Sequence, residues 1–157
     1  MKSLLAILLF FFSGVAAADI TGSAYVIDGD TIDISGVRIR LNGIDTPEIE
    51  QICRTNGLIW PCGVEATKLM RHLTKDKTVT CIGNTKDQYG RLIANCFVDD
   101  LNLNATMVES GMALAYRYYS LEYVEQEHVA RETKQGLWSG EFIAPWDWRK
   151  GKRLPKN

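Results

Sequence analysis

Five charged side chains have the types and the spacing to bind a metal ion together with an anionic group. They are Asp30, Arg40, Asp45, Glu48 and Arg91. A hard cation such as calcium prefers oxygen ligands, and two aspartates leave part of its coordination open. Arginine binds two oxygens of one phosphate and stays protonated at any working pH. The set therefore predicts metal-assisted chemistry on a phosphate ester, with Glu48 placed to orient or deprotonate a water molecule.

These residues fall in three short stretches, which are VIDGDT at 26–31, RLNGIDTPE at 40–48 and DQYGR at 87–91. Taken singly, each stretch is typical of an ordinary turn, because Asp-Gly, Asp-Thr-Pro and Tyr-Gly segments favour turn conformations. The presence of all three in one chain, in this order, is what favours a functional site.

The three stretches and their order resemble the staphylococcal (micrococcal) nuclease family, also called thermonuclease-like proteins. The similarity continues through Gly63-x-Glu65-Ala66, Gly111-x-Ala113 and Leu137-Trp138, and it spans roughly residues 21–140. The resemblance implies an oligonucleotide-binding (OB-fold) β-barrel with three helices. It also implies a single calcium ion and hydrolysis of phosphodiester bonds in DNA and RNA.

The resemblance also implies a role for each matching residue. The implied calcium ligands are the carboxylates of Asp30 and Asp45 and the backbone carbonyl of Thr46. The implied catalytic residues are Glu48, acting on the water, and Arg40 and Arg91, stabilising the phosphoryl transition state. All of these positions hold the expected residue type.

Aromatic side chains offer faces on which nucleic acid bases can stack. Tyr89 and Tyr116 resemble the tyrosines that flank the substrate in this family, with Tyr118 as a further candidate. His72 and His128 fall within helical segments, where we expect packing or surface roles, so no leaving-group acid is evident. The tryptophans, at 60, 138, 146 and 148, are interpreted as packing residues.

The elements that must position these residues form an α+β pattern. Strands are expected at 24–27, 31–34, 37–41, 78–82 and 91–98, and helices at 63–73, 101–110 and 121–135. A five-stranded closed barrel of the oligonucleotide-binding type suits this order. In the strand at 37–41 the alternation places Arg38 and Arg40 on one face and the aliphatic residues on the other.

The chain begins with the features of a secretory signal. Lys2 is followed by the apolar run 4–12 and then by small residues up to Ala18, after which we expect cleavage. A membrane anchor is the alternative, but a span needs about 20 apolar residues. The expected organisation is a signal peptide at 1–18, a nuclease domain at 19–148 and a basic tail at 149–157. The product is an exported monomer, periplasmic or secreted, with no membrane attachment after cleavage.

Export makes disulfides the favoured state of the four cysteines. Cys53, Cys62, Cys81 and Cys96 permit three pairings, and the economical one joins Cys53 to Cys62 and Cys81 to Cys96. A four-cysteine zinc site is the alternative, although the spacing lacks the short Cys-x-x-Cys turns that structural zinc favours.

Charge is unevenly distributed along a chain whose net charge is −1. Residues 19–148 carry 12 basic and 19 acidic side chains, whereas the last nine residues hold Arg149, Lys150, Lys152, Arg153 and Lys156. Either the tail holds a polyanion while the body cuts it, or the tail is a solvated terminus. The acidic body leaves substrate capture less certain than chemistry.

Two other functions remain open at this point. A non-catalytic nucleic-acid-binding module on the same barrel would not need Glu48. A calcium-dependent structural protein would explain Asp30 and Asp45 but not Arg40 and Arg91. The complete set of five residues favours the nuclease.

Overall fold

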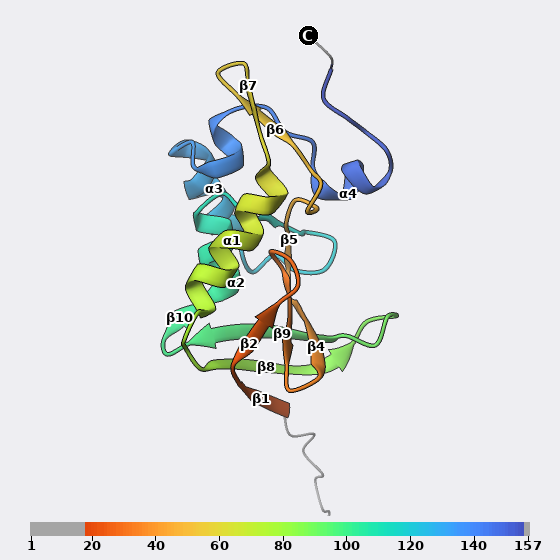
Figure 1. The fold of residues 1–157 in the computed structure, drawn as a ribbon, viewed down its shortest axis with the longest axis vertical. Helices are drawn as coiled ribbons and strands as arrows, with labels where there is room; N and C mark the ends of the chain where they lie inside the picture. Colours follow the sequence, from red (N-terminus) through yellow and green to blue (C-terminus); the bar gives the residue numbers. More distant parts are fainter. Residues whose placement is uncertain (1–17, 156–157) are drawn as a thin grey trace, which may run out of the picture.

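Seven strands form one mixed sheet that curls into a nearly closed barrel in the computed structural model, which describes residues 18–155 (Figure 1). Six strands follow one another in the order β1-β8-β9-β4-β3-β2, and β10 pairs with β9. Their bounds are β1 Ala18–Gly22, β2 Ala24–Val26, β3 Thr31–Ile34, β4 Val37–Leu41, β8 Val79–Lys86, β9 Leu92–Val98 and β10 Leu101–Asn102. The expected signal peptide, apart from Ala18, lies outside the described residues.

The five strands expected from the sequence are the central part of this sheet, so the predicted barrel is confirmed. β3 and β4 have the expected bounds, while β8 continues four residues beyond the predicted end. In β9 every second side chain, from Leu92 to Val98, is buried in the barrel, as period-two alternation requires. The sequence did not predict β1 and β10, which extend the sheet beside β8 and β9.

Three helices, α1 Cys62–Thr74, α2 Leu103–Glu109 and α3 Val124–Glu132, lie beside one another next to the barrel (Figure 1). All three were predicted, although α3 begins and ends three residues inside its predicted bounds. Two further elements were not predicted: a 3-10 turn at Gly136–Ser139 and the short helix α4 Pro145–Arg149. Within residues 18–155, no helix combines the length and apolar character needed to span a bilayer.

Helix α3 ends at Glu132, and the chain turns at Lys134, whose φ of 53° is in the left-handed region. Gly136 lies two residues further on and begins the 3-10 turn. Its φ is 50°, and a Cβ there would lie 2.6 Å from the carbonyl oxygen of Gly111, so only glycine fits without strain. Leu137 N–H donates to the same carbonyl at 3.0 Å.

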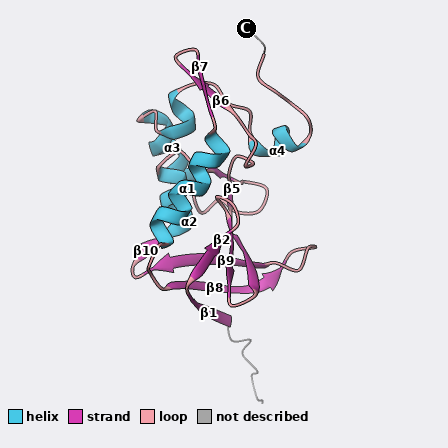
Figure 2. Cartoon of the chain, viewed as in Figure 1, coloured by secondary structure: helices cyan, strands magenta, loops and turns pink. Residues whose placement is uncertain are grey.

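Two small sheets stand apart from the barrel (Figure 2). β5 Ile44–Asp45 pairs with β11 Leu114–Ala115, and β6 Cys53–Thr55 forms a hairpin with β7 Leu58–Trp60. The predicted disulfides are confirmed: Cys53 bonds to Cys62 where the hairpin meets α1, and Cys81 bonds to Cys96 between β8 and β9.

A second, smaller core lies under the hairpin. It is built on the Cys53–Cys62 disulfide with Leu114 and Leu137, and the aromatic side chains that pack against it are Trp60, Trp138, Phe142 and Trp146. Three of the four tryptophans therefore have the predicted packing role. Phe142 and Trp146 belong to the C-terminal segment, which this core holds against the rest of the domain.

Candidate active site

Two buried carboxylates, Asp30 and Asp45, meet at the guanidinium of Arg40. Asp30 is 4% exposed and Asp45 is 0% exposed. Arg40 Nη2 lies 2.8 Å from Asp45 Oδ1, and Nη1 pairs with Asp30 Oδ1. The arrangement follows from strand register, because Thr31 on β3 lies opposite Arg40 on β4 and places the preceding Asp30 at the same end of the barrel. The structure thus brings together three of the residues singled out in the sequence.

Thr46 ties the two acidic turns to each other. Its backbone N–H and its hydroxyl both donate to Asp30 Oδ2, at 2.8 and 3.0 Å. A Cβ on Gly29 would lie 2.8 Å from the Thr46 hydroxyl oxygen, so glycine is required for this approach. Thr46 thus contacts Asp30 through its N–H and its hydroxyl. That its backbone carbonyl binds a metal ion stays a prediction.

Arg91 lies next to this pair because β9 runs parallel to β4, with Leu92 opposite Ile39. Asp87 orients it: Asp87 Oδ2 accepts from Arg91 Nε at 2.7 Å, and the guanidinium lies 5.3 Å from the centre of the Tyr89 ring. Burial would raise the pKa of Asp87, but its bonds with Arg91 lower that pKa below the usual value.

The charges of these groups influence one another. Burial lowers the pKa of Arg40, and the positive charge of Arg91 lowers it further, while Asp45 opposes the change. Burial raises the pKa of Asp28, which both arginines partly offset. Arg40 and Arg91 are therefore close enough to affect the same carboxylate, and a shared role on one phosphate stays a prediction.

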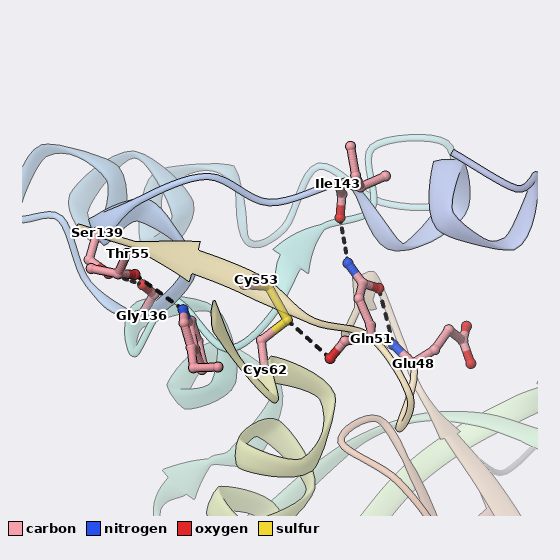
Figure 3. The surroundings of a disulfide bond; sticks show 9 residues. Glu48, Gln51, Cys53, Thr55, Cys62, Gly136, Ser139 and Ile143 are labelled. Carbon is pink, nitrogen blue, oxygen red and sulfur yellow. Dashed lines mark hydrogen bonds between the residues drawn. A yellow bond between two sulfur atoms is a disulfide. The ribbon is translucent and has the colours of Figure 1, made fainter. Parts of the chain in front are cut away.

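Glu48 stands at the edge of the site, and Gln51 holds its loop in place (Figure 3). The fully buried Gln51 side chain accepts from the Glu48 backbone N–H at 3.3 Å and donates to the carbonyl of Ile143 at 2.6 Å. The Gln51 carbonyl also accepts from Gly63 N–H at the start of α1. The loop is thereby fixed to both the disulfide hairpin and the C-terminal segment, while the Glu48 carboxylate remains half-buried.

Arg149, at the end of α4, contacts the carboxylates of the site, and the sequence did not predict this. Its Nη2 lies 2.7 Å from Asp45 Oδ2, and its Nη1 lies 3.1 Å from Asp45 Oδ1 and 2.8 Å from Glu48 Oε1. Burial alone would lower the pKa of Arg149, but these bonds raise it above the ordinary value. Over 100 residues separate Arg149 from both partners, so no spacing rule could have found it.

A cavity of about 510 Å³ opens beside Arg149. Its lining is Ala115, Tyr116, Arg117, Tyr118, Trp146, Arg149 and Lys150. The Tyr116 and Trp146 rings are stacked, with centroids 5.4 Å apart, and Tyr118 is 83% exposed. Two of the three candidate substrate-binding tyrosines therefore meet at this cavity, whereas the exposed Tyr89 lies with Arg91.

The donor set suits a hard cation. Among residues 18–155 there is no cluster of three or more His, Cys, Asp or Glu side chains that could enclose a metal ion. Asp30 and Asp45 nevertheless face one cationic group, Arg40, with anionic oxygen atoms on both sides of it. Calcium accepts such a set when carbonyl, water and substrate oxygens complete its coordination, so the residues fit an open metal site.

The amino-acid sequence is similar to those of known nucleases. A family model described as "Staphylococcal nuclease homologue" matches residues 38–140. A protein described as "Uncharacterized endonuclease" from Escherichia coli O157:H7 is 37% identical over 162 residues, covering 97% of this chain and all of that protein. A "Micrococcal nuclease" from Shigella flexneri is 31% identical over 176 residues, covering this whole chain and 96% of the relative.

The ion pairs of Arg40 yield a stability prediction. Arg40→Met should lower the free energy of unfolding by about 3 kcal/mol in metal-free buffer, because it leaves Asp30 and Asp45 without their shared partner. Arg91→Met should cost about 1 kcal/mol or less, since its pair with Asp87 is partly exposed. Urea unfolding of both variants measures the difference. Equal losses would show that the buried carboxylates do not depend on Arg40.

Proposed function

Because the chain belongs to the staphylococcal nuclease family, a family of metal-dependent nucleases, we propose that it is an exported, calcium-dependent enzyme that hydrolyses phosphodiester bonds of DNA, RNA or both. The observation that carries the proposal is the meeting of Asp30 and Asp45 at Arg40, with Glu48 at the edge of the same site. A binding module would have no use for two buried carboxylates that must be neutralised.

In this proposal Asp30, Asp45 and the carbonyl of Thr46 hold the calcium ion. When bound, the ion supplies positive charge to the phosphoryl oxygens and so reduces their repulsion of the attacking water. Glu48 orients or deprotonates that water from its half-buried position. Arg40, from β4, and Arg91, from the turn before β9, donate to the phosphoryl oxygens, where charge develops in the transition state.

Support for export comes from the cysteines. Both pairs are joined as disulfides, which persist in oxidising compartments such as the periplasm or the outside of the cell. The order of charged, apolar and small residues in 1–18 is that of a cleaved signal.

Calcium removal is the direct test of the activity. The purified mature protein should cleave single-stranded DNA when calcium is present and should stop when a chelator is added, because without the cation the carboxylates repel the anionic phosphate. Gel electrophoresis of the products measures this. Calcium-dependent binding without cleavage of either DNA or RNA would favour the non-catalytic binding module instead.

Glu48→Gln separates chemistry from binding. The variant keeps the shape of the side chain but cannot accept a proton, so kcat should fall by about 10²–10⁴, the usual contribution of a general base, with little change in KM. Glu50→Gln is the matched control, because Glu50 is an exposed carboxylate two residues further on. A parallel loss in kcat and substrate affinity would instead place Glu48 in metal or substrate binding.

A further inference from the structure

Arg149 holds both oxygens of the most deeply buried carboxylate in the site. Its guanidinium forms two bonds with Asp45, through Nη1 and Nη2, and a third with Glu48. Such a bidentate, charge-assisted pair is among the stronger polar contacts in proteins. Since Asp45 is fully buried, Arg40 and Arg149 between them satisfy its two oxygen atoms.

This position is built into the fold, because the chain that carries Arg149 is fixed at several points. Glu141 forms two backbone hydrogen bonds with Arg54 of the hairpin, at 2.9 and 2.7 Å, and Ile143 O accepts from the buried Gln51 (Figure 3). Trp146 packs on the core around the Cys53–Cys62 disulfide. The segment 141–149 therefore crosses from the hairpin to the catalytic carboxylates as a strap, and it lies beyond the family match, which ends at residue 140.

Arg149 and a metal ion compete for the same oxygens. A cation coordinated by Asp45 would stand within about 5 Å of the guanidinium, and like charges at that distance repel by several kcal/mol when water is partly excluded. Arg149 is the more exposed of the two arginines: its side chain is 41% exposed and lies at the end of a short helix, whereas that of Arg40 is 16% exposed. A metal ion at Asp45 would therefore displace Arg149 before Arg40.

The space next to Arg149 is suited to a nucleic acid strand. The cavity beside it is lined by the exposed Tyr118, by the stacked pair Tyr116 and Trp146, and by the cationic Lys150. Aromatic faces beside positive charge bind single strands without selecting a sequence. Arg149 already forms part of the lining of this cavity. Once released from Asp45, its guanidinium can therefore turn into the cavity.

We propose that Arg149 is a third phosphate-binding arginine of the active site, held by Asp45 and Glu48 in the metal-free protein and transferred to a backbone phosphate of the substrate strand when metal takes Asp45. The inference rests on the proposed nuclease function and deepens it. Arg149 therefore couples metal binding to substrate binding. It neutralises the carboxylates when the metal is absent, and it contacts the substrate when the metal is present.

The first test measures calcium binding in the absence of nucleic acid. Arg149→Gln should bind calcium about tenfold more tightly than the unmodified protein, because no guanidinium has to be displaced. Isothermal titration calorimetry measures the affinity. Lys152→Gln is the matched control: it removes one positive charge from the same segment, but Lys152 pairs only with Asp147, at 3.0 Å and largely in solvent.

The second test measures substrate binding with saturating calcium. Arg149→Gln should raise KM for a single-stranded oligonucleotide, and it should flatten the dependence of log KM on log salt by about 0.7, the value expected for one lost phosphate contact on a single strand. Lys152→Gln should keep the slope of the unmodified protein. A merely structural role for Arg149 would change KM without this change in slope.

The outcomes separate the alternatives. Equal calcium affinity in the two variants would overturn the competition at Asp45, and tighter calcium binding with an unchanged salt slope would leave Arg149 as a counter-ion only and overturn the phosphate contact. If the unmodified protein cleaves neither DNA nor RNA, the proposed nuclease function fails. The calcium titration and an anisotropy measurement of oligonucleotide binding would then still decide the role of Arg149.

Discussion

Two carboxylates that are buried in the same site must be neutralised whether or not a metal ion is present. Asp30 and Asp45 have almost no contact with solvent, and an uncompensated charge in such a place costs several kcal/mol. In the structure the compensation comes from Arg40, from the Thr46 N–H and hydroxyl, and from Arg149. The need to neutralise the carboxylates explains why cationic groups surround them.

Two separate parts of the fold position these charged groups. The barrel places Asp30, Arg40 and Arg91 side by side through the β3–β4 register and the parallel β4–β9 pairing. The disulfide hairpin and the C-terminal strap form the second unit, which fixes the Glu48 loop through Gln51 and carries Arg149 to the carboxylates. Basic side chains are thus gathered beside the carboxylates, although the body as a whole carries more acidic than basic residues.

Local signals in the sequence predicted what depends on local structure. The turns around Asp30 and Ser35 gave the bounds of β3 and β4, and the cysteine spacing gave both disulfides. β1 was missed because it begins at Ala18, where the small residues of the expected signal end. Helix α4 has only five residues, too few for a periodic pattern, and the contact of Arg149 with Asp45 joins positions 104 residues apart. Such a contact depends on the whole fold, which no local pattern encodes.

The most direct measurement is a crystal structure of the protein grown with calcium. We expect a calcium ion bound by the carboxylates of Asp30 and Asp45. The Arg149 guanidinium should then be turned away from Asp45 toward the cavity beside Tyr116. A structure in which Arg149 still holds both Asp45 oxygens, with calcium bound elsewhere or not at all, would contradict the proposed competition between Arg149 and calcium for Asp45. Asp45 would then be a structural ion-pair partner, and the buried carboxylates would not form the metal site.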